Sequence, residues 1–183
     1  MNRSRQGGLD ADACWVIRRL LVVLSVVGTL VSPLFATAAG AAGDDYPYRT
    51  AASSASDRWG FTERQCVSFA AWRLEQHRHA IKNTNNAWGN ASHWDDAARA
   101  RHITISTRPK VGAIAQWNAG ERSLYYAPGG GTGYLTAGSY GHVAYVAYVY
   151  GDGSVKVEQY NISGNRSFST MRVKAPRYLY MLG

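Results

Sequence analysis

The chain has 183 residues, with 20 basic and 12 acidic side chains and a formal net charge of +8. It shows no internal repeat and no low-complexity tail, which argues against a repeat protein. It also has no compact run of Lys and Arg, so nucleic acid is not an expected partner. The basic charge favours contact with other anionic polymers, or serves solubility alone.

The first 42 residues have the pattern of an export signal. Arg18 and Arg19 precede an apolar stretch at 20–31 that is short for a membrane span. Small residues at 36–42 offer A-x-A-like cleavage points. We therefore expect residues 1–42 to be a signal peptide, with an uncleaved anchor helix as the alternative. Its removal takes away four basic and two acidic residues, and leaves a secreted chain with a net charge of +6.

A lone cysteine stands out in the exported part of the chain. Cys14 lies in the signal segment, so Cys66 is the only thiol that remains. Exported domains commonly pair their cysteines in disulfide bonds, which Cys66 cannot do within the chain. It can be a small buried hydrophobe, a nucleophile, or one half of an intermolecular bridge.

The first half of the exported chain predicts helices. Residues 43–56 are small and polar, and we expect a flexible lead-in to a domain at 57–183. A helix is predicted over 62–79, where Thr62 and Gln65 match a capping box. Its buried face is set by apolar residues at helical spacing: Cys66, Val67, Ala70, Ala71 and Leu74. A second, short helix is predicted over about 92–101.

The second half predicts strands. They are expected at 111–117, at 141–150, at 154–161 and within 171–181. Residues 118–140 are rich in Gly, Tyr and Ser and predict a long loop, which we expect to border a substrate groove. Helices followed by antiparallel strands predict an α+β fold.

Cys66 and His142 are the best candidates for chemistry. Near a helix start, backbone N–H groups and the helix dipole stabilise a thiolate, so we expect a lowered pKa for Cys66. His142 follows Gly141 and opens an apolar strand, which suits a fixed general base as well as a structural histidine. His77 and His79 lie roughly 16–20 Å along the helix from Cys66. The histidines show no H-E-x-x-H spacing, so no metal is expected.

The strand at 154–161 can supply a third group that orients the imidazole. Strand alternation places Gln159 and Asn161 on the face of Val155 and Val157, and Glu158 on the other face. Alternation therefore favours Gln159 or Asn161, whereas a bulge in the strand would favour Glu158.

Five segments in order resemble the CHAP domain family, the cysteine, histidine-dependent amidohydrolases and peptidases. They are Trp59-Gly60-Phe61 with Gln65-Cys66, Trp88-Gly89-Asn90-Ala91 with Trp94, residues 109–117, residues 141–146 and residues 157–161. The resemblance covers about 59–161. Each segment alone is weak, and their order makes the resemblance specific.

The resemblance implies a papain-like (NlpC/P60-like) α+β fold, with N-terminal helices packed on an antiparallel sheet. It implies hydrolysis of peptidoglycan amide bonds, as an N-acetylmuramoyl-L-alanine amidase or an endopeptidase, without a cofactor. It assigns the nucleophile to Cys66 and the base to His142. The family's third group is usually a Glu two residues before an Asn, a position held here by Gln159. We expect Asn161 to orient His142, with Glu158 in a shifted register as the alternative.

The expected protein is a secreted monomer, extracellular or in the cell wall, that acts on peptidoglycan and also contacts anionic wall polymers. One rival is a non-catalytic wall-binding module, whose six Trp and 12 Tyr would stack on sugars. Another is an NlpC/P60-type cysteine peptidase. That type usually has a second His as its third group, and no His follows His142.

Overall fold

The computed structural model of the protein describes residues 43–52 and 54–182. The signal peptide expected at 1–42 lies outside this range. The helices are α1 (Cys66–Gln76) and α2 (Trp94–Ala100), with 3-10 turns η1 (Thr84–Asn86) and η2 (Ala91–His93). The strands are β1 (Ile105–Ser106), β2 (Ile114–Trp117), β3 (Arg122–Tyr126), β4 (Thr132–Thr136), β5 (His142–Val149), β6 (Val155–Tyr160), β7 (Phe168–Val173) and β8 (Arg177–Leu179). Within the described part, no helix has the length and apolar character needed to cross a membrane.

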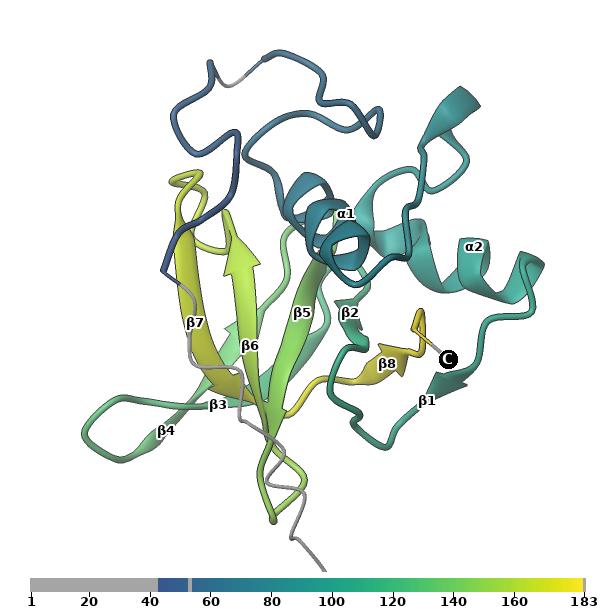
Figure 1. The fold of residues 1–183 in the computed structure, drawn as a ribbon. Coiled ribbons are helices and arrows are strands. Elements are labelled where there is room, and N and C mark those ends of the chain that lie inside the picture. Colours follow the sequence, from purple (N-terminus) through teal and green to yellow (C-terminus); the bar gives the residue numbers. More distant parts are fainter. Residues whose placement is uncertain (1–42, 53, 183) are drawn as a thin grey trace, which may run out of the picture. The chain divides into compact units, whose positions relative to one another are not determined.

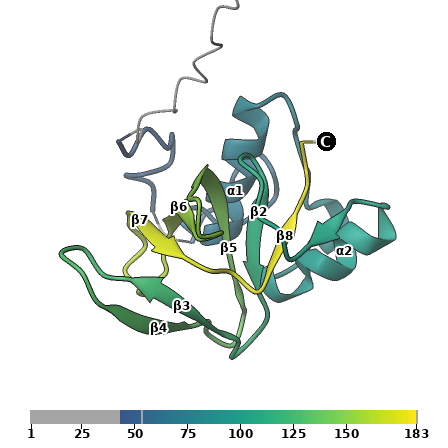
Figure 2. The same ribbon diagram turned by 90° about the horizontal axis from the view of Figure 1, so that it is seen from below.

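The strands form an antiparallel sheet in the order β1-β8-β2-β5-β6-β7-β3-β4. Helix α1 lies across β5 and β6 (Figure 1). Seen from below, the sheet is curled, with the β3–β4 hairpin at one end and β1 and β8 toward the other (Figure 2). Helices that precede an antiparallel sheet give the α+β organisation expected from the sequence.

Two apolar clusters hold the sheet and helices together. The first joins α1 and α2 to one face of the sheet, and includes Phe69, Leu74, Trp94 and Val143. The second lies on the other face, between residues of β2, β5, β6, β7 and β8: Ala115, Trp117, Ala144, Val146, Val157, Val173 and Tyr178. Successive side chains of a strand point to opposite faces and so enter the two clusters in turn. Strands β5 and β6 are therefore buried on both faces.

The helix at Cys66 begins later than the capping box predicted. Gln65 is its N-cap, in an extended conformation and without a side-chain cap bond. Arg64 has a φ of 60°, a left-handed conformation that does not fit a right-handed helix. The helix therefore cannot extend back through Arg64 to Thr62. Thr62 instead forms an isolated β-bridge with Ser56. The prediction that the helix starts at Thr62 was therefore wrong, and Cys66 is the first helical residue.

The long loop predicted at 118–140 is wrong for most of its length, because it contains the β3–β4 hairpin. Tyr125 and Tyr126 in one arm, and Thr132, Tyr134 and Thr136 in the other, are residue types that favour strands. The three glycines at 129–131 all have positive φ and form the turn. The last strand predicted within 171–181 is likewise two strands, β7 and β8.

The lead-in predicted at 43–56 packs closely against the domain. Tyr46 is fully buried and contacts the Ser68 hydroxyl on α1. The Tyr160 hydroxyl donates to Asp44 Oδ2 at 2.6 Å, and Arg73 Nη2 lies 3.1 Å from Asp45 Oδ1. Residues 44–46 thus supply packing, hydrogen bonds and one ion pair that composition did not reveal.

Candidate active site

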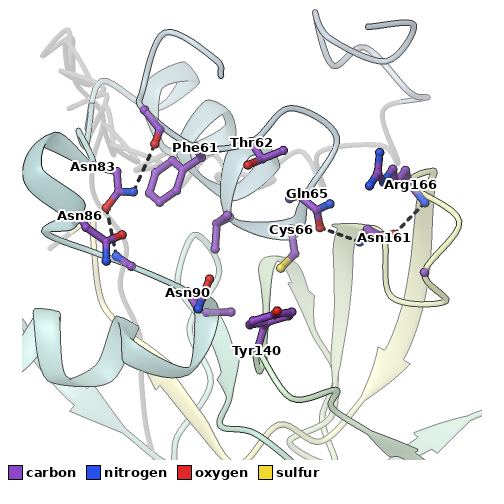
Figure 3. A pocket seen from close by; sticks show the side chains of 15 residues that line it. Phe61, Thr62, Gln65, Cys66, Asn83, Asn86, Asn90, Tyr140, Asn161 and Arg166 are labelled. Carbon is purple, nitrogen blue, oxygen red and sulfur yellow. Dashed lines mark hydrogen bonds between the residues drawn. The ribbon is translucent and has the colours of Figure 1, made fainter. Parts of the chain in front are cut away.

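Cys66 lies in a cleft of about 570 Å³ at the N-terminus of α1. The cleft is lined by Asn86, Asn90 and Phe61 toward one side and by Asn161 and Arg166 toward the other (Figure 3). The side chain of Tyr140, which is 70% exposed, faces the Cys66 sulfur. A half-buried thiol at a helix start, in an open cleft, is accessible to a substrate.

The pKa of the Cys66 thiol is raised, which corrects the lowered value expected from the sequence. Burial of the sulfur is the larger effect and disfavours the thiolate. Hydrogen bonds from the backbone N–H groups of Val143, Val67 and Cys66 itself favour the thiolate and oppose burial only in part. The resting side chain is therefore a neutral thiol.

The Val143 contact brings the nucleophile to the strand that carries His142. His142 is the first residue of β5 and is 3% exposed. Its ring packs against Trp117 of β2, with 5.7 Å between ring centroids. Gly141 has a φ of 71°, and a Cβ there would lie 2.5 Å from the Trp117 carbonyl oxygen. Only glycine fits this approach, which fixes the start of β5.

A hydrogen bond at one ring nitrogen of His142 determines its tautomer. Its Nε2 lies 2.9 Å from Oε1 of Gln159 on β6. An amide oxygen only accepts, so the imidazole proton is on Nε2 and Nδ1 is the basic nitrogen. Burial lowers the pKa of His142 to about 4, and the hydrogen bond with Gln159 opposes this shift only in part. The imidazole is neutral at neutral pH.

Glu158 does not contact His142 among the described interactions. Glu158 Oε2 forms an ion pair of 2.7 Å with Arg73 Nε of α1, and both side chains are less than 10% exposed. Burial raises the pKa of Glu158, while the nearby Arg73 charge lowers it. The carboxylate thus lies on the helix-facing side of β6, as strand alternation predicted.

Asn161 also has other partners. It has a φ of 62°, so the alternation of β6 ends there and its side chain turns toward the cleft. Its Nδ2 donates to Gln65 Oε1 at 2.7 Å, and its Oδ1 accepts from the Arg166 N–H at 2.8 Å (Figure 3). The structure therefore joins Asn161 to Gln65, beside Cys66, and joins His142 to Gln159.

Gln65, Tyr140 and Arg166 line the cleft but were not among the sequence-predicted site residues. For Gln65 a signal existed, since it directly precedes the candidate nucleophile. Of the remaining histidines, His77 contacts the Tyr145 hydroxyl at 2.7 Å, and His93 and His102 are exposed. None of these three lines the cleft, and the buried His142 is not among its lining residues either; the link from Cys66 to β5 is the N–H of Val143.

Comparison with known proteins gives a consistent set of matches. The family model of the CHAP domain matches residues 56–161. The N-acetylmuramoyl-L-alanine amidase sle1 of Staphylococcus epidermidis is 36% identical over 115 residues, which cover 61% of this chain and 29% of the relative. The staphylococcal secretory antigen SsaA of Staphylococcus aureus is 38% identical over 112 residues, 61% of this chain and 34% of the relative.

A solved structure also matches. It is the crystal structure of an N-acetylmuramoyl-L-alanine amidase from Staphylococcus aureus, with a TM-score of 0.50 and 26% sequence identity. The match covers 63% of this chain and 29% of that one. The chain therefore spans about a third of the length of the relatives it matches.

Proposed function

The chain belongs to the CHAP domain family, and from this premise we propose that it is a secreted hydrolase of peptidoglycan amide bonds with a papain-like fold. The observation that carries the proposal is Cys66 at the first position of α1, in an open cleft, with its sulfur against the backbone N–H of Val143. In this proposal the base is His142, the residue before Val143, which is buried and hydrogen-bonded to Gln159.

The first chemical step is attack of the Cys66 sulfur on the scissile carbonyl. Because thiol and imidazole are both neutral at rest, Nδ1 of His142 takes the thiol proton as the bond to carbon forms. His142 then gives that proton to the leaving amine, and the acyl group stays on Cys66. In the second step His142 removes a proton from water as its oxygen attacks the thioester carbonyl. The C–S bond then breaks, the acyl group leaves as a carboxylic acid, and the proton on His142 returns to the Cys66 sulfur.

The oxyanion that forms on attack needs hydrogen-bond donors. The backbone N–H of Cys66 is at the helix start and is not used within α1. Gln65 lines the cleft beside it, and Asn161 holds the oxygen end of the Gln65 amide at 2.7 Å. The NH2 end of that amide is therefore the one that can donate to the substrate. In this proposal Asn161 is a positioning residue that acts through Gln65.

Gln159 is our proposed orienting residue for His142, in place of Asn161 or Glu158. Its Oε1 accepts the Nε2 proton and so holds Nδ1 in the basic form. Ser169 on β7 steadies the Gln159 amide from the other side, at 3.4 Å. A neutral amide does not stabilise an imidazolium as a carboxylate does, which agrees with the lowered pKa of His142.

A direct test compares wild-type protein with Cys66→Ala and His142→Ala on purified peptidoglycan. We expect loss of lysis in both variants and retained binding to the wall. Lysis by Cys66→Ala would contradict the cysteine mechanism, whereas wall binding without lysis by the wild type would leave the non-catalytic wall-binding module as the better explanation. Treatment of the wild-type protein with iodoacetamide is a second test. It should abolish lysis and leave binding to the wall intact.

The bond that is cut can be read from the products. The relative sle1 is named an N-acetylmuramoyl-L-alanine amidase, which favours the bond between muramic acid and the stem peptide. Mass spectrometry should then find free stem peptides with L-alanine at their N-terminus. New N-termini inside the stem or cross-bridge would identify an endopeptidase instead.

A further inference from the structure

A second hollow lies at the other end of β6 and β7 from the Cys66 cleft. It has a volume of about 530 Å³, and we call it the tyrosine groove after three of its lining residues, Tyr125, Tyr126 and Tyr150. Lys156 and Arg172 add two cations. From Asn161 at the first cleft to Lys156 at the second, β6 rises by roughly 17 Å. The two hollows share none of their lining residues.

The groove continues the sheet face that α1 covers. Lys156 pairs with Arg172, and Arg172 with Tyr126, so their side chains form one row across β6, β7 and β3. Glu158, two residues from Lys156 and on the same face, lies under α1 through its ion pair with Arg73. The figures show α1 over β5 and β6, away from the β3–β4 hairpin (Figures 1 and 2). The hollow beyond α1 is lined by residues of β3, β6 and β7.

The groove is held in shape by Arg172. Its guanidinium lies between two tyrosine rings, 4.4 Å from the Tyr126 centroid and 4.1 Å from that of Tyr150. Asp152 binds Arg172 Nη2 at 3.0 Å and accepts from the Tyr126 hydroxyl at 3.1 Å. Ser154 accepts from Arg172 Nε at 2.8 Å. Side chains fixed before binding lose little entropy when a ligand arrives.

The chemistry of the groove suits a sugar polymer. A sugar ring has an apolar C–H face, which packs on an aromatic ring, and a polar rim, which needs donors and acceptors beside it. Tyr126 and Tyr150 supply rings, while Lys156 and Thr170 supply polar groups at the edge. Tyr148, which is 45% exposed, extends the aromatic surface through its edge contact with Tyr150.

Charge decides between kinds of polymer. Asp152 offsets Arg172, so the groove carries a net charge close to that of Lys156 alone. A polymer with a phosphate at every repeat needs a dense set of cations, as nucleic-acid sites show. A glycan strand with sparse carboxylates does not. We propose that the tyrosine groove is a second binding site, separate from the Cys66 cleft, for a glycan strand of peptidoglycan.

This inference rests on the proposed function, in which peptidoglycan is the substrate. The groove would add a way for the protein to remain bound to that polymer. A catalytic cleft and a second site on one insoluble polymer bind together more tightly than either does alone. The groove would hold the wall while the Cys66 cleft engages one stem peptide after another.

The test measures binding of the full chain to soluble glycan strands stripped of stem peptides, in a Cys66→Ala background. We expect Tyr126→Ala and Tyr150→Ala each to weaken binding by about tenfold or more. Tyr134→Ala is the matched control, because Tyr134 is 65% exposed and stacks on Arg122 outside the groove. Equal affinity in all three variants and the parent would overturn the proposal.

Lys156→Gln is a variant that should not disturb folding, because Lys156 is partly exposed and Gln keeps the aliphatic part of the side chain while removing the charge. It should weaken binding less and reduce its salt dependence. Free glycan strands and purified teichoic acid are compared as competitors for the bound protein. Displacement by glycan strands supports the proposal, and displacement by teichoic acid alone overturns it.

Hydrolysis of a small soluble muropeptide separates this inference from the proposed function. With Cys66 intact, the groove variants should cleave it at the wild-type rate, because it occupies the first cleft only. A chain that binds glycan strands through the tyrosines but cleaves nothing would contradict the proposed function and leave the groove standing. Normal cleavage, with glycan binding that ignores the tyrosines, would contradict the groove alone.

Discussion

Nε2 of His142 and Oε1 of Gln159 lie 2.9 Å apart, in a part of the sheet where both side chains are buried. The partner of the proposed base is thus a neutral amide rather than a carboxylate. This pairing fixes which nitrogen is basic but adds no charge to stabilise the protonated ring. The pH dependence of the proposed enzyme should follow from this difference.

Replacing Gln159 by Glu should move the acid limb of kcat/KM to higher pH. A carboxylate beside Nε2 favours the imidazolium, so the pKa of His142 should rise from its value of about 4. Wild type should therefore keep its activity at pH 5, where Gln159→Glu loses much of it. Gln159→Leu, with no acceptor, should lower kcat by about 10²-fold without that shift in the limb. Identical pH profiles in wild type and Gln159→Glu would show that the contact does not control the base.

Asn161 should act on rate through Gln65. Asn161→Gly removes the side chain and suits the φ of 62°, so the backbone is left unstrained. We expect kcat to fall by about tenfold, because the Gln65 amide loses the hydrogen bond that orients it. In a Gln65→Ala background the same change should have little further effect. Additive losses in the double variant would instead give Asn161 a role of its own.

Glu158 should matter for stability and little for rate. Glu158→Gln leaves the buried Arg73 guanidinium with only the more exposed Asp45, and should lower the free energy of unfolding by roughly 3 kcal/mol. Activity per folded molecule should stay near wild type. Urea unfolding and active-site titration separate the two quantities. A variant that is stable but inactive would return Glu158 to the site as an orienting carboxylate.

The parts of the site that could be predicted are those encoded locally. Cys66 before an apolar helical pattern and His142 at the head of a Val-rich strand are visible in short windows of sequence. Strand alternation alone predicts that Glu158 and Gln159 lie on opposite faces of β6. The ion pair of Glu158 with Arg73 of α1 agrees with this. The order of helices and strands likewise gave the α+β organisation.

The parts that could not be predicted depend on backbone conformations that residue types do not encode. A positive φ at Arg64 delays the helix to Cys66, although Thr62 and Gln65 match a capping box. Another at Asn161 ends the alternation that would have aimed its side chain at His142. Residue types alone do not separate Gln159 from Asn161, because both lie on one face of an ideal strand.

Alkylation of Cys66 should report a neutral thiol. Burial raises the pKa of the thiol, so the rate of reaction with iodoacetamide should rise with pH and reach its midpoint at or above the free value of about 8.5. A thiolate–imidazolium pair would react at a constant rate well below neutral pH. Small-molecule thiol alkylation under the same conditions is the control, and a plateau at pH 5–7 for the protein would contradict the neutral pair.

Acid should destabilise the fold through His142. In the unfolded chain this histidine titrates near pH 6.5, and in the folded chain at about 4. Between these values the unfolded state binds the extra proton, so stability falls as the pH falls. The full contribution is present above pH 6.5, and about 3 kcal/mol is lost by pH 4. Urea unfolding at pH 7 and pH 4.5 measures most of this loss, and His142→Asn should lack it. His77, His79, His93 and His102 are present in both proteins, so the comparison isolates the effect of His142. An equal loss of stability in wild type and His142→Asn would mean that the imidazole is not buried in its neutral form.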